Sequence, residues 1–315
     1  MSSYSARLSA AICRTGNPVC VGLDPRWNNL PAEIRERAVA AGGDTWEQKA
    51  RGFEEFSRRI IDVVAGLVPV VKPQAAFFEE CGPPGVAALW RVMRHARSAG
   101  LLVICDAKRG DIGSTAEAYA QAYLGDDGPG PGQGGVDALT INPYMGADTL
   151  QPFVDAAVKH QRGLYVLVRT SNPGAGTLQD IQDPAHTKIY QHVARLVEKL
   201  ADTTRGSDPY GCVGGVVGAT YPAELVELRQ AMPHTPLLIP GYGSQGAKAA
   251  DVAAGFGADG VGAVVNSSRG IIFAHEKKEY AARFSADRWE EAVLAATRDM
   301  IAELAPHCQP RKVTA

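Results

Sequence analysis

The residues best suited to chemistry follow a short apolar run, where Asp106, Lys108 and Asp111 form a D-x-K-x-x-D pattern. The run at 101–105 is rich in Leu, Val and Ile, as buried strands are. Residues two apart in a strand share a face, so Asp106 and Lys108 are predicted to point into the same space. Opposite charges at ~4 Å gain about 4 kcal/mol at an effective dielectric of ~20, before desolvation is subtracted. Paired in this way, the groups could remain charged at the end of an apolar strand.

Two structural explanations compete with a catalytic role for this cluster. Residues 114–117 read S-T-A-E and match a capping box, so Asp111 could simply favour a helix N-terminus. Asp106 and Lys108 could equally be a structural ion pair. On these residues alone the catalytic and structural explanations both stay open.

Lys72 changes the balance between these explanations. It directly follows the apolar run 67–71, so it is either a chain-end lysine reaching solvent or an inward catalytic group. If the two runs are adjacent barrel strands, Lys72 stands beside Asp106 and Lys108. Lys72 also brings the formal charge of the cluster from −1 to zero, and a neutral alternating array is cheaper to desolvate. The four residues are therefore predicted to form one catalytic array.

Glycine and arginine residues near the end of the chain predict a phosphate site. Residues 240–246 read P-G-Y-G-S-Q-G, in which Gly243 and Gln245 are candidate ligands, and residues 266–270 read N-S-S-R-G, which contributes Ser268 and Arg269. Each segment follows an apolar run, and these are the seventh and eighth such runs. Loops after strands seven and eight are the usual phosphate cradle of an α/β barrel. An arginine adds a planar fork of donors. The substrate is therefore expected to be a phosphorylated metabolite.

Asp24 and Asn142 each follow another apolar run. Asp24 could accept hydrogen bonds from a sugar hydroxyl, or it could make an Asx turn before Pro25. Asn142 could face the same site, but the Asn-Pro pair at 142–143 favours a turn.

The elements that must position these residues are eight short apolar runs, mostly continuous, as in parallel strands covered on both faces. They lie at 18–23, 67–71, 101–105, 136–141, 164–168, 213–217, 236–239 and 260–265. Helical spacing occurs between them, at 85–98, 186–201, 222–232 and 246–255.

This alternation predicts an α/β fold, a single (β/α)8 (TIM) barrel domain over 1–315 with its core at about 18–275. An open doubly wound sheet is the competing architecture, but no G-x-G-x-x-G follows the first run. Long βα loops are expected at 25–44 and 177–187, and a long surface loop at 125–135.

Composition excludes several classes of protein. The chain has 315 residues and a formal charge of −2, which provides no broad basic field for nucleic acid. Six widely spaced cysteines indicate reduced thiols, and the seven histidines have no zinc spacing. The longest apolar run, 63–71, is far too short to span a bilayer, and no signal peptide is recognisable. We expect a cytoplasmic protein with no membrane partner and no metal.

These segments together resemble orotidine 5′-phosphate decarboxylases from about residue 21 to residue 270. The D-x-K-x-x-D array is that family's most distinctive motif, and Lys72 matches its lysine on the second strand. The stretches V-K-P-Q-A-A-F-F-E, L-T-I-N-P-Y-M-G and S-N-P-G-A are similar to the longer bacterial branch. The resemblance implies decarboxylation of orotidine 5′-monophosphate to UMP in pyrimidine biosynthesis, without metal or organic cofactor.

The resemblance also implies roles for single residues. Lys108 would stabilise negative charge at C6 of the pyrimidine and then protonate it, while Asp106 would lie near the substrate carboxylate. Lys72 and Asp24 would contact the ribose hydroxyls, and Ser171 would bind the pyrimidine edge. Gln245 and Arg269 would hold the phosphate. A homodimer with shared active sites is implied, in which Asp111 and Thr115 act across the interface.

Two other functions remain as alternatives. Hexulose-phosphate synthases and ketogulonate-phosphate decarboxylases share the D-x-K-x-x-D array, but that group carries an acidic magnesium ligand where this chain has Lys72, a cation that would repel a metal. A non-catalytic phosphate-ligand sensor would be expected to lack at least one charged member of the array, and none is missing here.

Overall fold

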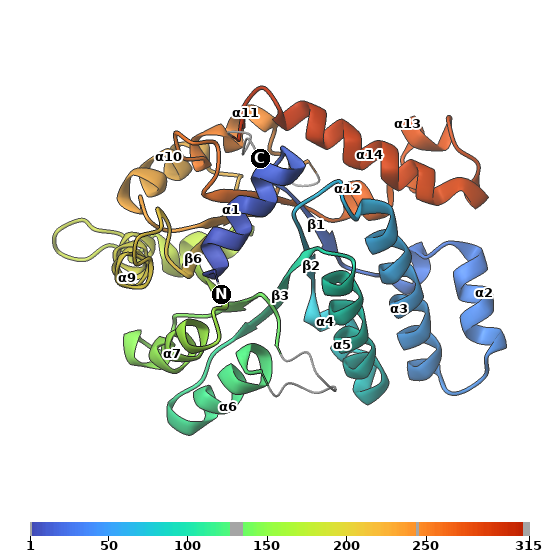
Figure 1. The fold of residues 1–315 in the computed structure, drawn as a ribbon, viewed down its shortest axis with the longest axis horizontal. Coiled ribbons are helices and arrows are strands. Elements are labelled where there is room, and N and C mark those ends of the chain that lie inside the picture. The colour runs from blue at the N-terminus through green and yellow to red at the C-terminus, as the bar shows by residue number, and fades with distance from the viewer. Residues whose placement is uncertain (1, 127–134, 244–245, 311–315) are drawn as a thin grey trace.

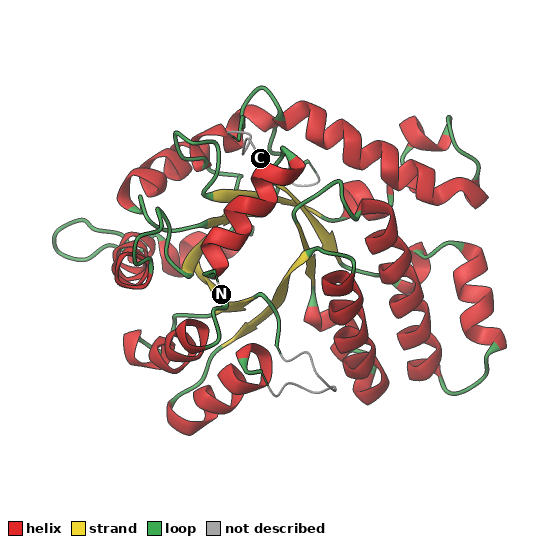
Figure 2. Cartoon of the chain, in the orientation of Figure 1, coloured by secondary structure: helices red, strands yellow, loops and turns green. Residues whose placement is uncertain are grey.

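Eight parallel strands close into a barrel in the part of the chain that the structure describes (Figures 1 and 2). The structure is a computed structural model and describes residues 2–126, 135–243 and 246–310. Neighbouring strands pair in chain order and β8 returns to β1, which confirms the predicted (β/α)8 fold. The strands are β1 (Val19–Leu23), β2 (Val70–Pro73), β3 (Leu102–Arg109), β4 (Ala138–Ile141), β5 (Gly163–Arg169), β6 (Val213–Val217), β7 (Leu237–Ile239) and β8 (Ala263–Ser267).

Helices lie around the barrel and across one end of it (Figure 2). They are α1 (Tyr4–Thr15), α2 (Ala32–Ala40), α3 (Thr45–Val64), α4 (Ala75–Glu79), α5 (Gly82–Ser98), α6 (Gly113–Leu124), α7 (Gln151–Lys159), α8 (Gly176–Gln179), α9 (Ile189–Thr204), α10 (Pro222–Ala231), α11 (Ala249–Val252), α12 (Arg269–Ile272), α13 (Lys278–Ala281) and α14 (Trp289–Leu304). No helix among the described residues combines the length and apolarity needed to cross a bilayer.

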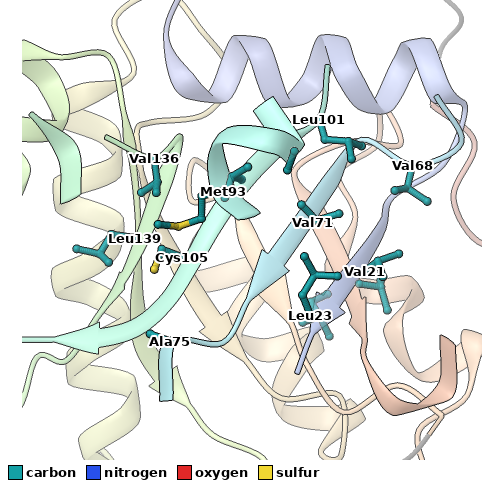
Figure 3. Packing of buried hydrophobic residues seen from close by; sticks show 14 of the residues in the cluster. Val21, Leu23, Val68, Val71, Ala75, Met93, Leu101, Cys105, Val136 and Leu139 are labelled. Atoms are coloured by element: carbon teal, nitrogen blue, oxygen red, sulfur yellow. The ribbon is translucent and has the colours of Figure 1, made fainter. Parts of the chain in front are cut away.

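Alternate residues of each strand belong to two different cores. Val21, Val71, Cys105 and Leu139 pack outward against the helices, and Figure 3 shows them with their neighbours. The residues just before them in sequence, Cys20, Val70, Ile104 and Ala138, fill the barrel interior. This period of two explains the continuous apolar runs, since both faces of each strand are buried. It also fixes which residues further along each strand face inward.

Helix α1 closes the amino-terminal end of the barrel, where sequence inspection predicted no helix. Figure 1 shows α1 lying across that end. Its Tyr4 is fully buried against Tyr165 of β5 with the rings edge to face, and the two hydroxyls lie 3.1 Å apart. Leu8 and Ile12 of α1 join the interior core. One end of the barrel is therefore sealed by α1.

Several sequence-based boundaries were wrong. The segment 25–44, expected to be a long loop, contains α2, which packs on α3. The helical spacing at 246–255 yields only the short α11 and a 3-10 turn at Ala253–Gly255. Most of the loop predicted at 125–135 falls on 127–134, outside the described residues. β2 and β3 continue beyond the apolar runs that predicted them. Backbone pairing extends into the polar residues, and a further bridge joins Gln74 and Asp106.

Candidate active site

Asp106 lies at the centre of a cluster of charges at the carboxyl-terminal end of β2 and β3. Lys72 Nζ is 2.8 Å from Asp106 Oδ2, and Lys108 Nζ is 2.6 Å from Asp106 Oδ1. Asp106 and Lys72 are only 7% and 4% exposed, whereas the Lys108 side chain is 46% exposed. The structure thus brings together three of the four residues in the predicted array, with Lys108 as its accessible member.

Mutual attraction keeps Asp106 and Lys72 ionised despite their burial. Burial alone would raise the pKa of Asp106, but the ammonium groups of Lys72 and Lys108 hold it well below its usual range. Burial alone would lower the pKa of Lys72, but the carboxylates of Asp106 and Asp24 raise it above its usual value. With two lysines and one aspartate charged, the cluster carries a formal charge of +1 in a single chain. That excess favours an anion in the space beside it.

Two neutral donors that sequence inspection missed complete the shell of Asp106. Gln74 Nε2 donates to Oδ2 at 3.0 Å, and Thr140 Oγ1 donates to Oδ1 at 2.9 Å. Each carboxylate oxygen therefore accepts from one ammonium group and one neutral group. Strand alternation could have predicted both residues. Gln74 lies two positions after Lys72 and Thr140 lies two positions after Ala138, and side chains two apart in a strand share a face.

A cavity of about 1200 Å³ opens beside the charge cluster. Lys72, Asp106 and Lys108 line it together with Ser171, and the cavity extends toward the loop after β5 and α9. Apolar strand residues, among them Leu167, Val216 and Leu238, form much of its wall. An apolar wall with a few convergent charges is typical of a site for a small molecule.

Asn142 combines both roles that its sequence left open. Its Oδ1 accepts a hydrogen bond from the backbone N–H of Tyr144 at 3.0 Å, which is the predicted turn. Asn142 also lines the cavity.

A buried arginine organises the loop that carries Ser171. Arg169, only 2% exposed, contacts Glu224 of α10 at 2.6 Å and Asp180 after α8 at 3.2 Å. Its guanidinium also lies over the rings of Tyr190 and Tyr221, with centroids at 5.0 and 4.6 Å. These contacts hold the segment around α8 against the barrel. Thr177, Leu178 and Gln179 of this segment line the cavity.

Asp24 and Ser268 lie at the rim formed by β1 and β8. Asp24 Oδ1 is buried without a hydrogen-bond partner among the described residues, and Asp24 acts electrostatically on Lys72. Gly22 pairs in register with Lys72, and a Cβ at Gly22 would overlap Ser268 Oγ. The glycine therefore leaves room for Ser268 beside the array. Asp24 is not among the described residues that line the cavity.

Asp111 and Thr115 do not join the cluster within this chain. Asp111 is partly exposed, and its Oδ1 accepts from the backbone N–H of Ile112 at 2.8 Å. Helix α6 begins at Gly113 after Ile112, without a side-chain cap. The capping box suggested at 114–117 is therefore wrong, because those residues already lie inside the helix. Thr115 is exposed in the first turn of α6.

The two loops with a predicted phosphate role are partly described. Gly243 has a φ of +68°, which favours glycine, and its N–H donates to Ala247 O at 2.9 Å. Gln245 lies outside the described residues. Arg269 begins the four-residue helix α12 and is exposed. Neither Gly243 nor Arg269 is part of the cavity wall in the described residues.

No group of three or more His, Cys, Asp or Glu side chains within the described residues is placed to hold a metal ion. At the position where a metal ligand would serve the magnesium-dependent alternative, the Lys72 ammonium group contacts Asp106.

Comparison with known proteins identifies the family. The sequence profile described as the orotidine 5′-phosphate decarboxylase / HUMPS family matches residues 17–284. Proteins named orotidine 5′-phosphate decarboxylase include one from Rhodopirellula baltica, 52% identical over 96% of this chain and 99% of that one. Another, from Haloarcula marismortui, is 43% identical over 86% of this chain and 87% of that one.

A solved structure agrees with the sequence matches. The structure of Leishmania donovani OMP decarboxylase superposes with a TM-score of 0.72 at 31% identity, covering 97% of this chain and 98% of that one. The chain therefore belongs to the orotidine 5′-phosphate decarboxylase / HUMPS family.

Proposed function

We propose that this chain decarboxylates orotidine 5′-monophosphate to UMP and carbon dioxide, as a step of pyrimidine biosynthesis. The single observation that carries the proposal is the Lys72–Asp106–Lys108 cluster in the wall of the cavity. Its net positive charge suits an anionic nucleotide, and its exposed lysine can reach a bound ring. The names of relatives that match nearly the full chain support the same activity.

The proposed chemistry breaks one carbon–carbon bond and forms one carbon–hydrogen bond. The bond from C6 of the pyrimidine to its carboxylate breaks, and the electron pair stays on C6 as carbon dioxide leaves. The Lys108 ammonium group stabilises that charge and then transfers a proton to C6. Lys108 afterwards recovers a proton from water. Asp106 lies near the departing carboxylate, and the repulsion between them is relieved as the bond breaks.

Binding of the rest of the nucleotide is assigned to the rim. Lys72 and the orphaned oxygen of Asp24 contact the ribose hydroxyls, and Ser171 binds the pyrimidine edge. The backbone of Gly243 and the side chains of Gln245, Ser268 and Arg269 hold the phosphate. Binding energy from these contacts to the remote phosphate would help to lower the barrier at the reacting carbon.

We also propose that the fourth charge of the array comes from a second copy of the chain. Asp111 lies just before helix α6 and is partly exposed, and Thr115 is exposed in the first turn of that helix. Ile112, Tyr144 and Met145, near the ends of β3 and β4, are exposed apolar residues at 62%, 80% and 44%. Exposed apolar side chains gathered beside a charged loop suit a homodimer interface. The partner's Asp111 would neutralise the +1 charge of the cluster.

The test is an assay with orotidine 5′-monophosphate in excess EDTA, following the change in pyrimidine absorbance. We expect full turnover, because Lys72 occupies the place of the metal ligand in the magnesium-dependent alternative. An enzyme that is inactive, or active only with added magnesium, contradicts the proposal. Hexulose and ketogulonate phosphates are the matched control substrates, and turnover of these alone favours the alternative.

A further inference from the structure

Lys108, which carries the proposed catalytic ammonium group, has an unusual backbone conformation. Its φ is +48°, and only three non-glycine residues in the described ranges have positive φ. A left-handed backbone conformation is strained for a non-glycine residue and persists only where its surroundings hold it. The register between β3 and β4 also shifts between Cys105 and Arg109, around this residue. Some specific contact must therefore hold Lys108 in place.

The Thr140 hydroxyl supplies that contact. The backbone N–H of Lys108 lies 2.9 Å from Thr140 Oγ1, where the shifted register leaves it apart from the regular ladder. Thr140 lies on β4 and is 1% exposed. Because an amide N–H can only donate, the hydroxyl oxygen accepts this bond. Its own hydrogen is then free to point at Asp106 Oδ1, 2.9 Å away.

One hydroxyl thus joins the backbone of Lys108 to the carboxylate that binds the Lys108 ammonium group. Both ends of the lysine are fixed through Thr140, one directly and the other by way of Asp106 Oδ1, which lies 2.6 Å from Lys108 Nζ. Gln74 offers a natural comparison. It donates to the other oxygen of Asp106 at 3.0 Å but has no bond to the backbone of Lys108.

We propose that Thr140 is a positioning residue for the decarboxylation, which sets where the Lys108 ammonium group stands relative to the reacting carbon. It acts through Lys108 and Asp106, since its hydroxyl is already used twice by them. Removing the hydroxyl would free the backbone of Lys108 from its left-handed conformation and swing the ammonium group. Displacements of about 1 Å in a reacting group can lower the rate ~10²-fold. The inference rests on the proposed function.

The test compares Thr140→Val, Thr140→Ser and Gln74→Leu in the full-length chain. For Thr140→Val we expect kcat to fall about 10²-fold, with UMP affinity by calorimetry within about threefold of wild type. Exchange of the C6 hydrogen of UMP with D2O, followed by NMR, should fall in parallel because it uses the same lysine. Thr140→Ser restores the hydroxyl and should recover most of kcat. Gln74→Leu should lose less than Thr140→Val.

Several outcomes would overturn the inference. These are a Thr140→Val enzyme with nearly wild-type kcat, a Thr140→Ser enzyme as slow as Thr140→Val, or a Gln74→Leu enzyme that is equally slow. Loss of UMP affinity as large as the loss of kcat would also overturn it, because that indicates a general structural role. If Thr140→Val does not fold, Thr140→Ala against Thr140→Ser gives the same comparison. An inactive wild-type chain contradicts the function itself, whereas an active wild type with unaffected variants contradicts only the role of Thr140.

Discussion

Two buried aspartates lie at opposite ends of the barrel, and each is surrounded by cations. Asp106 is at the carboxyl-terminal end of the strands, with Lys72 and Lys108 at 2.8 and 2.6 Å. Asp137 precedes β4 at the other end, 2% exposed, with Arg7 Nη1 at 2.6 Å. Arg97 and Arg162 approach Asp137 at 3.8 Å. Both carboxylates are buried, and each contacts more than one cation.

The difference lies in what the cations connect. At Asp137 two of the three arginines come from covering helices, since Arg7 belongs to α1 and Arg97 to α5, and Arg7 also donates to Gln161 O at 3.0 Å. Asp137 further accepts from the backbone N–H of Val103 at 3.0 Å. Planar guanidinium groups suit such multiple contacts. This end of the barrel is covered by α1 (Figure 1), and the contacts of Asp137 stabilise the fold there.

At Asp106 the cations are lysines on the strands themselves, and one of them faces a cavity. Lysine is a mobile point charge that can gain and lose a proton, which a guanidinium group does not do in proteins. A buried aspartate therefore pairs with arginines that stabilise the fold at one end, and with lysines that can offer a proton at the other. This agrees with the general separation of stability and catalysis between the two faces of α/β barrels.

The largest effect expected at the Asp106 end is that of Lys108→Ala. It removes both the proton donor and the charge that stabilises C6, so turnover should fall on the order of 10⁴-fold or more. UMP binding, measured by calorimetry, should remain detectable because the phosphate contacts are intact. Lys159→Ala, at the exposed end of α7, is the matched control and should keep wild-type turnover. Equal collapse of UMP binding would mean that the role of Lys108 is misassigned.

Hybrid dimers sharpen the comparison further, because only the Asp106 end is proposed to need a second chain. Lys108→Ala and Asp111→Ala chains, each nearly inactive alone, are mixed and allowed to exchange. Half of the randomly formed dimers then contain one intact site, so about a quarter of wild-type turnover should return. A mixture that stays inactive, while size-exclusion chromatography shows exchanged dimers, contradicts the sharing of Asp111.

The sequence predicted most of the fold and the part of the site that follows from strand alternation. Eight apolar runs indicate the barrel, and barrel geometry predicts that Lys72 lies beside Asp106. Thr140 and Gln74 were missed because single polar residues at strand ends have many ordinary explanations. The bond from Thr140 to the backbone of Lys108 depends on a register shift between β3 and β4, which no local pattern encodes.

The Asp137 cluster was also missed, for a different reason. Arg7 and Asp137 are 130 residues apart, and the helix that carries Arg7 was not predicted. An aspartate just before a strand resembles an ordinary turn residue. Long-range contacts between the covering helices and the barrel are therefore the part of this structure that is hardest to predict from the sequence.

The smallest effect on turnover is expected at the Asp137 end, from Asp137→Asn. Removing this charge breaks the ion pair between buried Asp137 and Arg7, so the free energy of unfolding should fall by about 3–5 kcal/mol, measured by urea denaturation. Below the unfolding transition, kcat and KM should stay within about twofold of wild type, because the Asp106 cluster is unchanged. Asp155→Asn, on the exposed face of α7, is the control and should change stability by less than ~0.5 kcal/mol. A folded Asp137→Asn enzyme with strongly reduced kcat would mean that the Asp137 and Asp106 ends are coupled. The barrel would then not separate the residues that stabilise the fold from those that carry out the reaction.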